Sequence, residues 1–300
     1  MDKGEWIKGV AHWVDGETAM ISIAFTWRLP EARQISTYYR SLGRTVRIGG
    51  PAVFTKRARD YMTGYGEIGG NAPDAIARHN PMATFASRGC PVGCHFCIVT
   101  PMEGAEFTEF PDFIVRPVLC DNNLSALEPA YQDHIVGRYL REGVPLLDAN
   151  SGFEPGTFDE DVFRRWSPVL KGPWRFGFDE KGEGNAVERV MRMLRGVPPR
   201  RKQVYTMIGH EPFDVCMDRI QRVIAWGGEP YAQPFMQLNT LEKRPKVRHD
   251  WTELKLRQVA RWVNRHIWRK TPFAEYDASA KTPRAIDHTW DGMLFEGHAE

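Results

Sequence analysis

The sequence contains little cysteine and no long apolar run. Only five of its 300 residues are cysteine, and an odd number with three grouped does not suit the disulfide framework of a small secreted protein. No apolar stretch reaches the roughly 18 residues that a membrane helix requires, and the N-terminus lacks the apolar segment of a secretory signal. We therefore expect a cytoplasmic protein with reduced cysteines and no membrane partner.

The chain also lacks an excess of charge of one sign, internal repeats and low-complexity segments. Its 40 Lys and Arg residues nearly balance 38 Asp and Glu residues, which leaves a formal net charge of +2. The molecule as a whole is not a polycation, so any affinity for nucleic acid must come from a local patch. With 42% hydrophobic residues, the chain is long enough for a sizeable core.

From residue 83 onward, strand-like and helical patterns alternate, which predicts an α/β fold of parallel βα units. The strand-like segments are 83–89, 115–123, 144–152, 174–180, 202–210 and 230–238, and the helical patterns include 124–141, 159–170, 185–194 and 214–226. Six units do not complete an eight-fold barrel. We therefore expect a partial (β/α)6 barrel over 76–240, with its mouth at the carboxyl ends of the strands.

Two smaller regions flank this core. Residues 1–75 are expected to form a small α/β segment of the β-α-β type, because an apolar strand at 19–27 is followed by a helix opened by Pro30 and a second strand at 45–53. Residues 241–300 are expected to form a basic helical extension at the C-terminus.

Polar residues end four of the predicted core strands. Since the carboxyl ends of parallel strands meet at one edge of a sheet, these side chains are expected to gather where a ligand can bind. Each of them alone could equally start a turn, which is common for Asn, Asp and Ser. As a set they favour a site, and they are Asp121, Asn122, Asn123, Asp148, Asn150, Ser151, Asp179, Glu180, His210 and Glu211.

The strongest motif is Cys90-Pro-Val-Gly-Cys94-His-Phe-Cys97. Thiolates are the usual ligands of iron–sulfur clusters, and three of them leave one iron open to chelate a small molecule. Zinc usually requires a fourth Cys or His at regular spacing, and His95 is badly placed because it adjoins Cys94. Three buried free thiols are a further interpretation, which the tight grouping disfavours. The isolated Cys120 and Cys216 are expected to be buried packing thiols.

This motif, directly after a first strand and with the aromatic Phe96 before its last cysteine, resembles the signature of the radical S-adenosylmethionine (SAM) superfamily. The six βα units are similar to that family's partial barrel, so the resemblance covers 83–240. It implies that Cys90, Cys94 and Cys97 hold a [4Fe–4S] cluster, and that an electron donor of the flavodoxin or ferredoxin type reduces it. SAM would be cleaved to methionine and a 5′-deoxyadenosyl radical that removes hydrogen from the substrate.

The resemblance also implies residues that contact SAM. Phe96 would pack beside the adenine. Asp121 and Asn123 stand where the family usually has a Gly-Gly-Glu-like element for the amino group, so they are the candidates to replace it. Asn150 and Ser151 would meet the methionine carboxylate or the ribose.

Two later strand ends complete the implied site. Asp179 or Glu180 would bind the ribose hydroxyls. The segment 205–211 loosely resembles the family's adenine-side element, which makes Ile208 a further SAM contact. His210 and Glu211 are the candidate catalytic residues, and for His210 a structural role is equally open.

The N-terminal segment resembles a shrunken cobalamin-binding domain of the kind that precedes some radical SAM cores. A complete domain would normally carry Asp-x-His-x-x-Gly, and no such motif stands before the cysteines. We therefore expect no cobalamin.

The C-terminal region is locally basic. Arg257, Arg261 and Arg265 are four residues apart, so they line one helix face that could meet phosphates. A solvated helix face is the alternative interpretation of this stripe.

Three functions remain open at this point. The first is radical modification or rearrangement of a nucleic-acid base or its appended group, as in bacteriophage DNA hypermodification, with DNA or a nucleotide as partner. The second is radical modification of a peptide or a small metabolite. The third is a non-catalytic iron–sulfur protein, which the ordered polar strand ends disfavour. The reaction subclass, whether isomerase, transferase or oxidoreductase, stays open.

Overall fold

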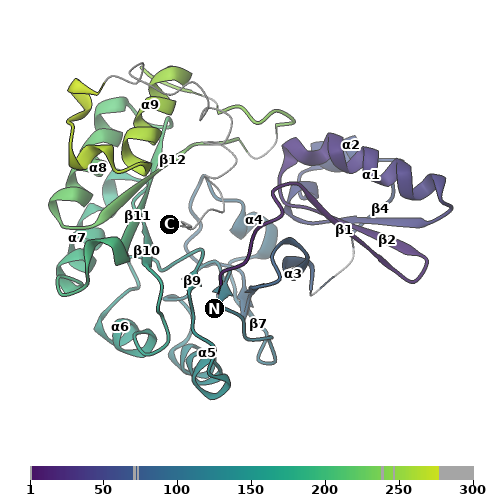
Figure 1. Cartoon of the computed structure of the whole chain (residues 1–300), viewed down its shortest axis with the longest axis horizontal. Helices are drawn as coiled ribbons and strands as arrows, with labels where there is room; N and C mark the ends of the chain where they lie inside the picture. The colour runs from purple at the N-terminus through teal and green to yellow at the C-terminus, as the bar shows by residue number, and fades with distance from the viewer. Residues whose placement is uncertain (1, 70–71, 73, 238–239, 246, 277–300) are drawn as a thin grey trace.

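The structure is a computed structural model. It describes residues 2–69, 72, 74–237, 240–245 and 247–276. The fold is mixed α/β with several small sheets, none of which closes on itself within these ranges. An N-terminal sheet with two helices lies on one side of the molecule, and a larger set of parallel strands lies on the other (Figure 1).

The N-terminal sheet has the strand order β1-β2-β3-β4. Its elements are β1 (Val10–Asp15), β2 (Thr18–Ile23), α1 (Leu29–Ser41), β3 (Thr45–Gly49), α2 (Lys56–Met62) and β4 (Glu67–Ile68). β1 and β2 form an antiparallel hairpin, whereas β2, β3 and β4 are parallel and joined through the two helices. The segment β2-α1-β3 matches the β-α-β pattern of the sequence, while β1 and β4 were not expected.

This sheet has its own hydrophobic cluster. Ile21, Ile23, Leu29 and Ile48 are fully or almost fully buried in it. Gly50 ends β3 because its backbone has a φ of 95° and a Cβ there would lie 2.5 Å from the carbonyl oxygen of Ile23. The strand is therefore shorter than the pattern over 45–53 indicated.

Six parallel strands follow one another in chain order through the rest of the molecule. They are β5 (Ala83–Thr84), β8 (Val118–Leu119), β9 (Asp148–Ala149), β10 (Trp174–Gly177), β11 (Lys202–Ile208) and β12 (Glu229–Pro234). The first three form one parallel sheet and the last three another. Parallel bridges from Leu146 to Leu170 and from Phe153 to Phe176 connect the two. The partial barrel itself stays a prediction, because these pairings leave the strands as open sheets.

Helices separate the later strands, as the sequence pattern predicted. They are α5 (Pro129–Glu142), α6 (Glu160–Trp166), α7 (Gly184–Met193) and α8 (Phe213–Ala225), and they lie on the outer side of the strands (Figure 1). On α7, Val187, Val190 and Met191 are buried at helical spacing against the strands. The last helix, α9 (Glu253–Asn264), packs on β12 and α8 and shares their core cluster.

Shorter elements occur between and after these. They are α3 (Ala75–His79), β6 (Ser87–Arg88), α4 (Val99–Glu103), β7 (Thr108–Glu109) and the 3-10 turns Thr26–Arg28, Pro51–Val53, Lys181–Glu183, Pro199–Arg201, Ile267–Arg269 and Phe273–Glu275. β6 and β7 pair antiparallel and frame the cysteine motif. No helix in the described ranges is long and apolar enough to cross a membrane.

Candidate iron–sulfur site

The cysteine loop, residues 89–104, runs from the end of β6 through the three thiols to the end of α4. The Cys90 N–H donates to the carbonyl oxygen of Gly104 at 3.2 Å, and the Thr100 hydroxyl donates to the Cys90 carbonyl at 3.1 Å. Gly89 begins the loop with a φ of 96°, and a Cβ there would collide with the carbonyl oxygen of Glu106. All three thiols are half-buried and none forms a disulfide.

Glu103 holds the N-terminal end of this loop in place. Its carboxylate accepts hydrogen bonds from the guanidinium of Arg88, from the Gly89 N–H at 3.0 Å and from the Asn122 amide at 2.6 Å. The contact with Asn122 ties the loop to the polar residues that follow β8. Glu103 was not predicted from the sequence, because a single glutamate on a short helix does not indicate which residues it will contact.

The thiols share one electrostatic environment. Burial, together with the neighbouring Cys97, Glu154, Glu183 and Cys90, raises the pKa of Cys94 to about 12. Burial also raises the pKa of Cys97, which the Val99 N–H, 3.4 Å from its sulfur, partly offsets. In the absence of a cation, these raised pKa values favour the protonated thiols of Cys94 and Cys97. A bound metal centre would stabilise the thiolates instead.

Asp121 and Asn123, the candidates for the SAM amino group, have different environments. Asp121 is fully buried, and its oxygens accept from the Ala86 N–H at 2.9 Å and the Ser87 hydroxyl at 2.5 Å. Burial raises the pKa of Asp121 to about 6. Asn123 instead directs its amide toward the Cys90 sulfur, 3.8 Å away. In this conformation Asp121 holds β6 in place, and Asn123 is the one that reaches the cysteine loop.

A second group of acids lies after β10. Burial and the carboxylate of Glu183 raise the pKa of Asp179 to about 7, although its Oδ1 accepts from the Met207 N–H at 2.8 Å. Glu183 accepts from the N–H groups of both Asp179 and Glu180, at 2.6 and 3.0 Å. The Glu180 carboxylate in turn accepts from the Glu183 N–H, and this reciprocal capping box holds Glu180 at the strand end.

His95 joins the loop to two strand ends. Its Nδ1 lies 2.7 Å from the Glu180 carboxylate, and its Nε2 lies 3.4 Å from Nε2 of His210. The Phe96 ring meets the edge of His95 with centroids 5.2 Å apart. The predicted residues Phe96, Glu180 and His210 are thus brought together by a residue that the sequence interpretation had set aside.

Three other predicted site residues do not join this group around His95. Ile208 is fully buried in the core with α8 and α9, and Ser151 is exposed. Glu211 pairs with the buried guanidinium of Arg219. The sequence offered no signal for this pairing, because Arg219 is an ordinary helical position.

Asn150 belongs to a buried polar network that sequence reasoning also missed. Arg175, only 2% exposed, lies 3.0 Å from Asp148 and donates to Asn150 Oδ1 at 3.3 Å. It also donates to the Tyr205 hydroxyl at 3.0 Å, and Lys3 reaches Asp148 at 3.6 Å. The network links adjacent strands β9, β10 and β11 below their carboxyl ends.

Arg257 and Arg261 lie on one side of α9, and Arg265 follows directly as the C-cap residue of the helix. Arg257 and Arg261 are half-buried and Arg265 is exposed at the end of the helix. The opposite side of α9 is buried through Leu256 and Val259. The arginines therefore lie on the side of the helix that faces away from its buried residues, and a nucleic-acid partner stays a prediction.

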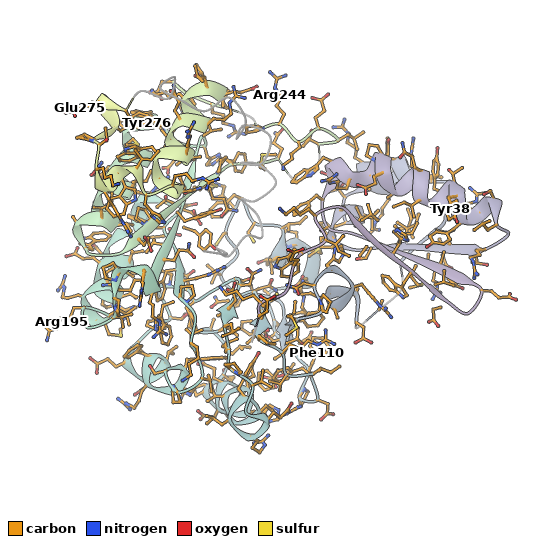
Figure 2. The ribbon with its side chains drawn as sticks, in the orientation of Figure 1. Tyr38, Phe110, Arg195, Arg244, Glu275 and Tyr276 are labelled. Carbon is orange, nitrogen blue, oxygen red and sulfur yellow. The ribbon has the colours of Figure 1, made fainter. Side chains whose placement is uncertain are left out.

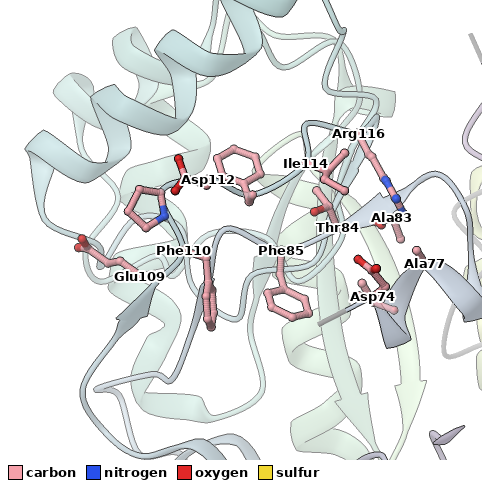
Figure 3. Close-up of a pocket in the computed structure, with 13 residues that line it drawn as sticks. Asp74, Ala77, Ala83, Thr84, Phe85, Glu109, Phe110, Asp112, Ile114 and Arg116 are labelled. Atoms are coloured by element: carbon pink, nitrogen blue, oxygen red, sulfur yellow. Dashed lines mark hydrogen bonds between the residues drawn. The ribbon is translucent and has the colours of Figure 1, made fainter. Parts of the chain in front are cut away.

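One cavity of about 500 Å³ lies elsewhere, between α3, β5 and the segment after β7 (Figure 3). Phe85, Phe110 and Arg116 are among the residues that line it. None of the predicted site residues lines this cavity, so it is separate from the cysteine loop.

The chemistry of the loop fits an iron–sulfur cluster. Its donors are three cysteines, with a side-chain amide and a backbone N–H directed at their sulfurs, which are typical neighbours of cluster thiolates. As the side chains stand, no group of three or more His, Cys, Asp or Glu residues in the described ranges is arranged to hold a metal ion. Comparison with known protein families finds no match, and comparison with curated proteins finds no relative.

Proposed function

We propose that the chain is a radical SAM enzyme in which Cys90, Cys94 and Cys97 hold one [4Fe–4S] cluster. The observation that supports this best is the grouping of these thiols on one loop that polar residues from three strand ends reach. Asn123 comes from the end of β8, Glu180 from β10 and His210 from β11. When bound, the cluster and SAM supply one-electron cleavage of the sulfonium and removal of hydrogen from a substrate.

The residues of this chain would then bind the cluster and orient SAM. Asn123 and the Val99 N–H would stabilise thiolates at Cys90 and Cys97. Glu103 would keep the loop against the end of β8, and Glu180 would hold the ring of His95. Asn150, Asp179 and Glu180 supply the polar groups that the resemblance assigns to the methionine and ribose portions of SAM.

For the substrate, we favour a nucleic-acid base or its appended group. The α9 stripe of Arg257, Arg261 and Arg265 supports a polyanionic partner, since guanidinium groups match phosphate geometry. Radical modification of a peptide or small metabolite, and a non-catalytic iron–sulfur protein, are the other outcomes that experiment has to separate. An electron donor of the flavodoxin or ferredoxin type, in a reducing cytoplasm, completes the proposal.

The test is cofactor cleavage by anaerobically reconstituted protein with dithionite as reductant. We expect formation of 5′-deoxyadenosine from SAM, measured by liquid chromatography. A protein that carries iron and sulfide but forms no 5′-deoxyadenosine, with or without DNA, would favour the non-catalytic alternative.

A further inference from the structure

The turn from Arg248 to Trp251 is held against the residues that follow β11. The Trp251 N–H donates to the Arg248 carbonyl at 3.2 Å, and the Trp251 indole N–H donates to the Glu211 carbonyl at 2.8 Å. Asp250 accepts from the Phe213 N–H at 3.0 Å. These contacts hold the second half of the turn, and the bond from Trp251 closes the turn on Arg248, which lies near enough to His210 to affect its pKa.

The chain adopts an uncommon backbone conformation to make this turn. His249 has a φ of 54°, in the left-handed region that residues other than glycine seldom occupy. Such conformations persist where surrounding contacts determine them, and they are frequent in ligand-binding segments. The contacts of Asp250 and Trp251 supply that support here.

A row of rings connects the turn to the cysteine loop. The Arg248 guanidinium lies 6.0 Å from the centroid of the Phe235 ring, and the Phe235 ring lies 4.6 Å from that of His210. His210 in turn contacts His95. Phe235 is held by its own N–H, which donates to the Ile208 carbonyl at 2.9 Å. Arg248, Phe235 and His210 therefore form one surface that reaches the cysteine loop at His95.

Arg248 gives this surface a positive charge. Within the described ranges Arg248 has no acidic partner, whereas Arg244 on the same segment pairs with Glu253. His210 Nδ1 is buried and has no hydrogen-bond partner in the same ranges. Burial lowers the pKa of His210, as do Arg248, His95 and His249, while Glu211 opposes this shift. An anion bound here would complement Arg248.

We propose that Arg248, Phe235 and His210 bind a nucleotide, with the guanidinium on a phosphate and the two rings against the base. Guanidinium groups suit phosphate oxygens, and bases stack on aromatic side chains without regard to sequence. This proposal rests on the proposed function in one respect: the bound nucleotide would be the substrate that lies next to SAM. The nucleotide could be free or part of a DNA strand, since the phosphate and the base are common to both.

The experiment measures binding by calorimetry to the reconstituted full-length protein. The probes are a deoxynucleoside 5′-monophosphate, the deoxynucleoside without phosphate, inorganic phosphate and a short single-stranded DNA. We expect Arg248→Gln to weaken monophosphate binding about tenfold or more. Phe235→Leu should weaken binding of the monophosphate but leave that of inorganic phosphate unchanged. Stronger binding of the DNA than of the monophosphate would assign the site to a strand, and the reverse would assign it to a free nucleotide.

Arg244→Gln is the matched control. Arg244 lies four residues before Arg248, at the outer edge of the molecule (Figure 2), and pairs with Glu253. Its substitution is expected to leave nucleotide binding unchanged. Equal affinities of wild type and Arg248→Gln, or equal affinities for nucleotide and nucleoside, would overturn the proposal. So would a failure of every probe to bind at low salt. Cleavage of SAM by the wild type without nucleotide tests the radical SAM function separately, so the two failures can be told apart.

Discussion

At the scale of single residues, the cysteines of the loop differ sharply from Cys216 in their surroundings. Cys97 is half-buried and accepts a hydrogen bond from a backbone N–H, whereas Cys216 is fully buried in the core of α8 and α9. We predict that Cys97→Ala abolishes SAM cleavage and that Cys216→Ala leaves it largely intact. The readout is 5′-deoxyadenosine formed with dithionite, and equal loss in both variants would overturn the ligand assignment.

The buried pair of Asp148 and Arg175 gives a second prediction at this scale. Without Arg175, Asp148 keeps only the more exposed Lys3 as a cationic partner within the described ranges. Loss of a buried ion-pair partner costs about 3–5 kcal/mol. Arg175→Met is expected to lower the free energy of unfolding by about this amount. Denaturant titration of the reduced protein measures it.

Arg192 provides the matched control for this substitution. Its side chain is 73% exposed and pairs with Glu188 across one helical turn, so Arg192→Met should change the free energy of unfolding by only about 0.5 kcal/mol. A similar loss in both variants would mean that the buried network has no special part in stability.

At the scale of elements, α9 and its C-cap residue carry the three arginines of the predicted basic stripe. Neutralising Arg257, Arg261 and Arg265 together to Gln should weaken DNA binding and flatten its salt dependence, because fewer counterions are released. Fluorescence-anisotropy titrations of wild type and triple variant at several salt concentrations measure both quantities. If the wild type binds neither duplex nor single strands at low salt, the nucleic-acid hypothesis fails.

Most elements of the core could be predicted from the sequence, because alternating strand and helix patterns carry their own periodicity. The structure has a parallel strand within or overlapping each of the six expected segments and a helix for each of the four expected patterns. The strand lengths could not be predicted. β9 has only two residues, since Leu146 and Phe153 on either side of it make single bridges to neighbouring segments instead of extending the ladder.

The first strand of the N-terminal hairpin could not be predicted from the sequence, for a different reason. β1 exposes Trp13 partly and Val14 substantially, so its residues lack the clean apolar alternation of a half-buried strand. Its pairing with β2 is decided by the turn at Gly16, whose φ is 58°. Such an edge strand is recognisable only once its neighbour is known.

The candidate site was predictable where residues are close in the sequence and not where they are far apart. The cysteine spacing marked the loop itself. Glu103, Arg175 and Arg248 each interact with partners 13 or more residues away, such as Asn122 for Glu103, Asp148 for Arg175 and Phe235 for Arg248. Long-range pairing of this kind is a property of the fold, and one sequence carries no direct signal for it.

At the scale of the whole molecule, stability should depend on pH through Asp121. Its pKa is raised from 3.8 to about 6 in the folded protein, so the folded chain holds the proton more tightly than the unfolded chain. The resulting stabilisation is complete below pH 3.8 and is lost as the pH rises through about 6. A shift of this size corresponds to about 3 kcal/mol in the free energy of unfolding.

Asp121→Asn should therefore flatten the decline in stability over this pH range. Denaturant midpoints of the reduced, cluster-free protein at several pH values measure the effect. Asp112→Asn, at an exposed position, should leave the pH profile as it is in the wild type. An unchanged profile in Asp121→Asn would assign the pH dependence to other groups.

We propose that this chain holds a single iron–sulfur cluster on the cysteine loop. The most direct measurement is anaerobic reconstitution followed by iron and sulfide analysis and Mössbauer spectroscopy. We predict about four irons per chain with the spectrum of one [4Fe–4S] cluster, which is lost on exposure to oxygen. Tightly bound zinc without sulfide, or about eight irons per chain, would contradict the account.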